Sequence, residues 1–158
     1  GFELVEPLKE LFKDQVRDLA RELGLPEKRI ERQPFPGPAL ATRIVGEVTP
    51  ERVEIVRKAS KIVEEEIERF SERPFQYFPV LLNDRATGIR NGKRQLGNII
   101  VVRSVESKDA MTAEPTRLSW FLLQTIEERI TREIPSVTRV VYDITRKGEG
   151  YTGTIEYI

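Results

Sequence analysis

Residues 88–98, GIRNGKRQLGN, combine three glycines with the cations Lys93 and Arg94. Backbone amides exposed at glycines can surround a phosphate group together with basic side chains. Gln95 adds a side-chain amide oxygen that could accept a hydrogen bond from the same ligand. The same composition is also typical of an exposed β-hairpin tip, which is the more common use of such a sequence. The residues alone allow both interpretations.

A second candidate is the segment Gln33–Val48, which carries prolines at positions 34, 36 and 38. Each proline fixes φ at about −65° and removes a backbone donor, so the segment can be neither a helix nor an inner strand. We therefore predict a stiff, pre-shaped loop, followed by a short strand that starts near Ile44. Arg43 would be a fixed cation at the end of this loop. A rigid connector without a ligand explains the prolines equally well.

A third candidate is the C-terminal segment from Lys147 to Glu156, which contains a cation and an acidic acceptor. A ligand with a phosphate and a polar ring needs cations for the phosphate and acceptors for the ring. The plainer interpretation of Lys147 is an ordinary loop lysine beside the end of a strand. Glycines at 148, 150 and 153 predict a flexible connection within the segment.

Composition excludes several classes of function. The 158 residues contain no Cys and no His, so a cysteine nucleophile with a histidine base is absent. Basic and acidic residues number 26 each, so no global field attracts nucleic acid or an anionic membrane. No apolar run approaches the ~20 residues of a membrane span and no signal peptide is visible, so we expect a cytoplasmic protein. The lack of cysteine beside abundant Arg and Glu favours a thermophilic source.

The hydrophobic pattern predicts the elements that would position these residues. Apolar residues at helical spacing predict helices, the second of them capped by Thr49, over residues 7–23, 50–70 and 114–134. Alternating or continuous apolar runs predict strands at 74–82, 99–106, 137–144 and 153–157. In the second helix, we expect Glu64, Glu65, Glu66 and Glu68 to be solvated, because adjacent helical positions point in different directions and so do not form a metal site.

The two helices that follow the leading one, together with four or five strands, are most economically packed as a two-layer α+β sandwich. We predict a small, mostly antiparallel sheet with both helices on one face, in a domain that spans residues 33–158. Residues 1–32 would form a leading segment. The open face or an edge strand of such a small sheet has to be covered, and pairing with a second copy would cover it. We therefore expect a homodimer.

Four ordered segments of the chain resemble the C-terminal dimerisation domain of GMP synthases. PFPGPALATRIVGEVTPER resembles the family's PFPGPGLAxRxxGEVT signature, and VRSVESKDAMTA resembles its xRxVESxDxMTA segment. VTRVVYDITRK resembles its VxRVVYDITxKPP segment, and TIEYI stands where the family ends in TIEWE. Upstream, LVEPLKELFKDQVRDLARELGLP resembles the end of the family's ATP-pyrophosphatase domain, to which residues 1–32 would then belong. The resemblance covers nearly the whole chain but only the C-terminal part of the enzyme.

The resemblance implies a function. GMP synthases aminate xanthosine monophosphate (XMP) at the expense of ATP, and in the archaeal kind a separate glutamine amidotransferase chain supplies the ammonia. Transferred onto this sequence, with Gln95 as a substitute acceptor, the XMP contacts would be Arg43, Arg94, Gln95, Lys147, Ile155 and Glu156. ATP and Mg²⁺ would be bound by the upstream domain and not by this segment. None of these residues would be a nucleophile.

The chain departs from the family at positions that would contact the ligand. Gly148–Gly153 replaces a Pro-Pro-x connection and is three residues longer, and Gly92 stands in place of an Asp. No Ser-Gly-Gly-x-Asp-Ser loop for pyrophosphate occurs, so the segment alone should be inactive. Its start at Gly1, without Met, suggests a piece of a longer enzyme. The departures favour a rival hypothesis, a homodimerisation or interaction module that has lost nucleotide binding.

Overall fold

The structure, a computed structural model, describes residues 4–30, 33, 40–69, 73–108 and 111–157. The chain divides into two compact units, Gly1–Pro34 and Phe35–Ile158, and each is described by itself. In the first unit, α1 (Lys13–Glu22) and α2 (Glu27–Ile30) are helical. The predicted helix over 7–23 therefore starts later than expected, at a point where the Gln15 side chain accepts a hydrogen bond from the Phe12 amide at 2.8 Å. Assignment of this unit to an ATP-pyrophosphatase domain stays a prediction.

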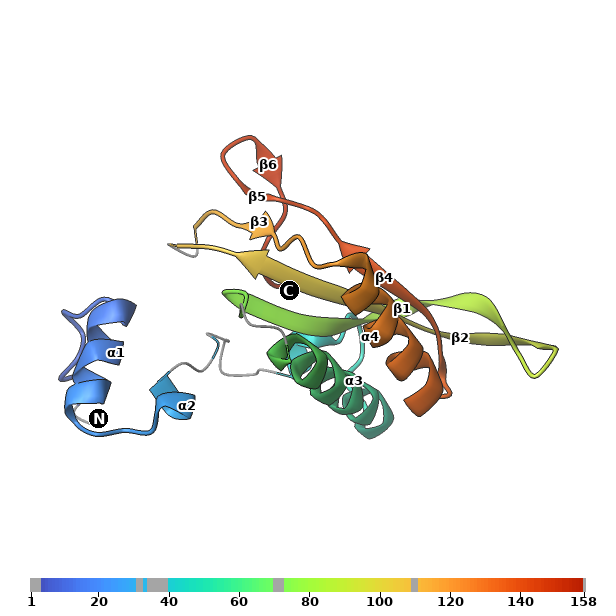
Figure 1. The fold of residues 1–158 in the computed structure, drawn as a ribbon, viewed down its shortest axis with the longest axis horizontal. Coiled ribbons are helices and arrows are strands. Elements are labelled where there is room, and N and C mark those ends of the chain that lie inside the picture. Colours follow the sequence, from blue (N-terminus) through green and yellow to red (C-terminus); the bar gives the residue numbers. More distant parts are fainter. Residues whose placement is uncertain (1–3, 31–32, 34–39, 70–72, 109–110, 158) are drawn as a thin grey trace. The chain divides into compact units, whose positions relative to one another are not determined.

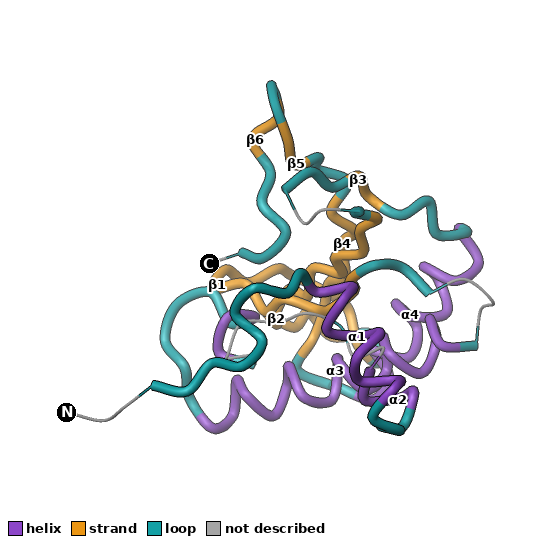
Figure 2. Tube along the Cα trace, turned by 90° about the vertical axis from the view of Figure 1, so that its left-hand side faces the viewer, coloured by secondary structure: helices purple, strands orange, loops and turns teal. Residues whose placement is uncertain are grey.

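The second unit is a two-layer α+β sandwich, which confirms the predicted fold class (Figure 1). In chain order, the elements are η1 (Ala41–Arg43), α3 (Pro50–Glu68), β1 (Gln76–Arg90), β2 (Lys93–Glu106), β3 (Glu114–Pro115), α4 (Trp120–Glu133), β4 (Val137–Asp143), β5 (Lys147–Gly148) and β6 (Tyr151–Thr152). Helices α3 and α4 lie on the same side of β1 and β2 in both views (Figure 2).

Strand β2 is the centre of the sheet. It pairs antiparallel with β1 along one edge, whereas its other edge pairs with β4 in parallel and with the short β3 antiparallel. Helix α4 forms the crossover that a parallel β2–β4 pair requires. Strands β5 and β6 form a separate two-stranded hairpin. The sheet is therefore mostly antiparallel, as predicted, with one parallel pair.

The two faces of the sheet bury different sets of side chains, because successive residues of a strand point to opposite faces. The helix-facing side includes Tyr77, Leu81, Ile100 and Val102, which pack against apolar residues of α3 and α4. The opposite face carries a second buried cluster, formed by Phe78, Val80, Val101, Val105, Ala113 and Ile155. Since Ile155 belongs to the C-terminal segment, that segment covers part of the face that the helices leave open.

The candidate turn at residues 88–98 is the far end of a long two-stranded ribbon. Arg90 pairs with Lys93, so that only Asn91 and Gly92 form the turn, with φ values of 51° and 73°. Two consecutive positive φ angles are typical of the tight hairpin turn that fits the twist of a ribbon. The hairpin interpretation of this segment is confirmed, and phosphate binding by it stays a prediction.

Other predicted elements also differ from the structure. Helix α4 starts at Trp120 after the cap Ser119, whereas the first residues of the predicted helix form β3. Phe121, one of the apolar residues on which the predicted helix was based, is 73% exposed. Near Ile44, the predicted strand is reduced to one isolated bridge to Leu81. Residues 153–157 form no strand, and pairing in this region is confined to β5 and β6.

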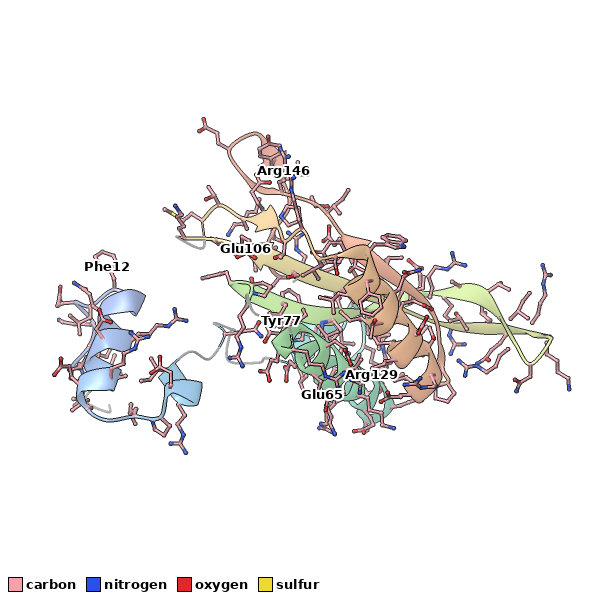
Figure 3. All side chains as sticks on the ribbon, viewed as in Figure 1. Phe12, Glu65, Tyr77, Glu106, Arg129 and Arg146 are labelled. Carbon is pink, nitrogen blue, oxygen red and sulfur yellow. The ribbon has the colours of Figure 1, made fainter. Side chains whose placement is uncertain are left out.

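The acidic run of α3 was also wrongly predicted to be entirely solvated. Glu66 is only 2% exposed, and its carboxylate contacts Arg129 of α4 at 2.5 Å. Arg129 also contacts Glu65 at 2.8 Å, and Figure 3 shows these two side chains together between the helices. Among the described residues, no group of side chains has the composition of a metal site. None of the helices in those ranges is long and apolar enough to cross a bilayer.

Candidate functional site

The predicted ligand contacts do not all lie at one place on a single chain. Arg94 and Gln95 lie near the tip of the β1–β2 ribbon, where Gln95 Nε2 donates to the Pro135 carbonyl at 3.0 Å. Lys147 begins β5, and the β5–β6 hairpin lies at the other end of the sheet (Figure 1). The structure therefore does not bring Arg94 and Gln95 to the same place as Lys147.

Three of the other predicted residues gather at the first half of β1. Gln76 and Phe78 share the face of β1 that points away from the helices. Gln76 Nε2 donates to Glu156 Oε1 at 3.3 Å, and Phe78 belongs to the same buried cluster as Ile155. Arg43 lies over the Phe78 ring, with 5.7 Å between the guanidinium carbon and the ring centroid. Arg43, Ile155 and Glu156 are thus neighbours of one strand segment.

Arg43 is buried rather than presented on the surface. Its side chain is held by Ser60 of α3, whose hydroxyl accepts from Nη1 at 3.0 Å, and by the face of Phe78. Burial lowers the pKa of Arg43 from its usual value, against the opposing charge of Glu64. The 3₁₀ turn of η1 fixes the backbone at this point. A contact between Arg43 and a ligand stays a prediction.

Lys147 lies beside an open groove of about 680 Å³. The strand bridge to Ala113 fixes its backbone, since each residue donates its amide to the other's carbonyl at 2.9 Å. The groove is large enough for a small ligand and combines cations with acids, because Lys108, Glu106 and Glu149 also line it. The glycine connection that was predicted to be flexible forms the β5–β6 hairpin, with φ values of 150° and 79° at Gly148 and Gly150.

Two buried polar residues of this region were missed at the sequence level. Gln76 is 1% exposed and holds the Glu156 carboxylate, and Arg103 of β2 is fully buried on the same face of the sheet. The available signal was a single arginine inside the apolar run IIVVRSVE. A charge at that position has to be paired, because the penalty for burying an isolated guanidinium is large.

The side chains of this region are of the kind that hold a ligand through charges and hydrogen bonds. The sequence contains neither the cysteine nor the histidine of a nucleophilic site. The region offers Lys147 in a groove of mixed charge, lined by two lysines and three glutamates, and a carboxylate acceptor, Glu156, on a segment held by buried contacts. Such groups can orient a phosphorylated molecule for a reaction that another segment performs.

Comparison with known proteins gives a consistent result. The sequence model of the family described as "GMP synthase C terminal domain" matches residues 64–157. The chain is 56% identical over 155 residues to a protein of Archaeoglobus fulgidus that is named as a subunit of glutamine-hydrolyzing GMP synthase. This alignment covers 98% of the chain and 49% of that protein. Proteins of the same name from Thermococcus kodakarensis and Methanopyrus kandleri are 56% and 53% identical over 147 and 152 residues, each covering 93% of the chain and 48% of the relative. The chain thus spans about half the length of the curated relatives it matches.

Proposed function

Because this chain belongs to the GMP synthase C-terminal domain family, we propose that it is the dimerisation and XMP-binding part of a GMP synthase of the archaeal kind. In the complete enzyme, ATP and Mg²⁺ would be bound by an ATP-pyrophosphatase segment upstream. A glutamine amidotransferase subunit would supply ammonia. The purine 2-oxygen of XMP would be adenylylated and then displaced by that ammonia to give GMP.

The observation that carries this proposal is the family match over residues 64–157, which contains Lys147, Ile155 and Glu156. The relatives that align with nearly the whole chain are named as GMP synthase subunits, which supports the same assignment. The buried contacts of Glu156 and Ile155 are further support, since a carboxylate that binds substrate has to be held in position.

The contribution of this chain to the reaction would be positioning. Lys147 would neutralise the 5′-phosphate of XMP, and Glu156 would accept from the ribose or the base. Holding two substrates in line removes much of the entropic barrier to their reaction. Arg94 and Gln95 lie on the distant ribbon, so they could contact the same XMP only from a second copy of the chain.

Replacing Lys147 with alanine in the complete enzyme is expected to raise the Kd for XMP by roughly 10- to 100-fold, because one charged hydrogen-bonding partner of the phosphate is lost. The Kd for ATP should stay the same. Isothermal titration calorimetry with each nucleotide measures both values. Lys61→Ala is the matched control, since Lys61 is an exposed lysine of α3 with a weak contact to Glu65 at 3.8 Å.

A second candidate function is an interaction module without a nucleotide. It is favoured by Gly148–Gly153, which form a hairpin where the family has a proline connection. The same titration separates the two functions. If the enzyme does not bind XMP, or if Lys147→Ala leaves the Kd for XMP unchanged, the interaction module is supported. Either result would contradict XMP binding at Lys147.

We expect the chain to form a symmetric homodimer, largely through the region after residue 40, since a small sheet needs cover and since Trp120 and Phe121 at the start of α4 are 73% exposed. Light scattering at micromolar concentration should give twice the chain mass of 18.2 kDa. A monomer over the whole concentration range would exclude the dimerisation role while leaving XMP binding to be judged by titration.

A further inference from the structure

Arg103 lies at the centre of the sheet face opposite the helices and is fully buried. In the strand register, it stands between Phe78 of β1 and Asp143 of β4. Its guanidinium reaches the chain that follows β4, because Nη1 donates to the Thr145 carbonyl at 2.7 Å and Nη2 to the Thr154 carbonyl at 2.8 Å. One side chain thus ties together two points of the chain that are nine residues apart in sequence.

A carboxylate completes this arrangement from the neighbouring strand. Asp143 Oδ2 lies 3.1 Å from Arg103 Nη1 and also accepts from the Tyr157 hydroxyl at 2.8 Å. The other oxygen, Oδ1, accepts from the Thr145 amide at 2.8 Å. Burial tends to raise the pKa of Asp143, but these hydrogen bonds and the charge of Arg103 outweigh it and lower the pKa from its usual value. The carboxylate therefore stays ionised at neutral pH.

The segment that these groups hold is fixed by side-chain contacts and not by strand pairing, since Gln76 bonds Glu156 and Ile155 packs in the cluster of Phe78. Residues 153–157 belong to no strand, and the Gly153 amide donates to the Arg146 carbonyl at 2.9 Å. Ordering such a segment costs conformational entropy for each residue. Arg103 binds the segment at Thr154 and, through Asp143, at Tyr157. Ile155 and Glu156 lie between these two anchors, with Ile155 only 4% exposed.

We propose that Arg103, Asp143 and Tyr157 form a clamp that fixes the segment Thr154–Tyr157 on the sheet and thereby sets the position of Ile155 and Glu156 toward the nucleotide. The second half of this inference rests on the proposed XMP-binding function. Arg103 is then a positioning residue that acts through the segment and does not contact the nucleotide itself. Its planar guanidinium suits the task, because one rigid group reaches several oxygens at once, which a lysine ammonium on a flexible stem does not.

The clamp is tested with substitutions that keep the shape of the side chain. Tyr157→Phe removes only the hydroxyl bond to Asp143, and Asp143→Asn removes the charge that faces Arg103. Tyr142→Phe is the matched control, because its hydroxyl bonds to the Thr116 carbonyl at 2.6 Å and the Ser104 carbonyl at 3.3 Å, neither of which belongs to residues 153–157. Arg103→Lys is added as a fourth variant, with circular dichroism to verify that it folds.

Hydrogen exchange of this chain, followed by mass spectrometry of peptides covering residues 150–157, measures how tightly the segment is held. Tyr157→Phe and Asp143→Asn should each speed exchange there about tenfold or more, because a hydrogen bond to a charged group is lost. Tyr142→Phe should leave that peptide unchanged. Unchanged exchange in both Tyr157→Phe and Asp143→Asn would overturn the clamp.

Binding of XMP and ATP to the complete enzyme measures whether the clamp serves the nucleotide. The Kd for XMP should rise about tenfold in Tyr157→Phe and Asp143→Asn, whereas the Kd for ATP should not change. Faster exchange without a change in XMP affinity would overturn the positioning role. If wild-type enzyme fails to bind XMP, the proposed function fails and the positioning role with it, while the exchange experiment still decides whether the clamp exists.

Discussion

Replacing Arg129 with methionine is expected to lower the free energy of unfolding by about 3 kcal/mol. Arg129 joins α4 to α3 through Glu65 and Glu66, and its Nε contacts Glu133 at 3.0 Å within α4. These hydrogen bonds raise the pKa of Arg129 above its usual value, the bond to Glu133 most of all. Without Arg129, the partner that the buried carboxylate of Glu66 keeps among the described residues is Arg69, whose side chain is 68% exposed. The main cost is therefore an undercompensated buried charge.

Arg132→Met is the control for this variant. It makes the same chemical change on the same helix, but the Arg132 side chain is 70% exposed and contacts Glu133 at 3.4 Å. An exposed ion pair of this kind contributes less than about 1 kcal/mol. Urea denaturation of both variants gives the two free energies of unfolding. Equal losses in Arg129→Met and Arg132→Met would show that the α3–α4 ion pairs do not stabilise the helix layer.

Replacing Gly97 with alanine is expected to cost about 3 kcal/mol, at the upper end of the range for overpacking. A Cβ at Gly97 would lie 2.4 Å from Thr138 Cγ2 and 2.7 Å from the Ser136 carbonyl oxygen. A rotamer change could move the threonine methyl, but the carbonyl oxygen is backbone and can move only with the loop between α4 and β4. The Asn98 amide donates to that same carbonyl at 2.7 Å, so displacement of the loop would also weaken this bond.

Gly92→Ala provides the comparison at the tip of the same ribbon. No atom lies within 4 Å of a Cβ at Gly92, so only its positive φ of 73° resists the substitution. An alanine in that conformation costs about 1 kcal/mol. Thermal and urea unfolding should therefore rank Gly97→Ala well below Gly92→Ala in stability. A loss in Gly97→Ala no larger than that in Gly92→Ala would mean that the loop does not pack on the ribbon.

Local sequence signals were enough to predict the elements whose stability depends on residues that are neighbours in sequence. Thr49 and Pro50 predicted the start of α3 within the chain, and the structure confirms it, with the Arg52 amide donating to Thr49 Oγ1 at 3.3 Å. The continuous apolar run in residues 99–102 also predicted a strand over 99–106, which forms the buried half of β2. Such patterns follow from the periods of helix and strand, so they can be read without knowledge of the fold.

The ends of other elements depended on partners that are distant in sequence. The second half of β1, from Asn83 onward, has no buried residue and few apolar side chains, yet it stays extended because it pairs with β2. The sequence at Glu114 and Pro115 predicted the start of a helix, but these residues form strand β3 and pair with β2. In both cases, the backbone hydrogen bonds of a neighbouring strand outweighed local propensity.

The candidate site likewise has features that the sequence predicted and features that depend on residues distant in sequence. The sequence by itself determined the fold class, the family motifs and a set of polar residues that includes Lys147 and Glu156. Only the tertiary structure separated Arg94 from Lys147, buried Glu66 between two helices and placed Arg103 beneath the C-terminal segment. The physical reason is that burial of a charge is decided by the acceptors that surround it, and for Arg103 these come from Asp143, Thr145 and Thr154, forty or more residues away.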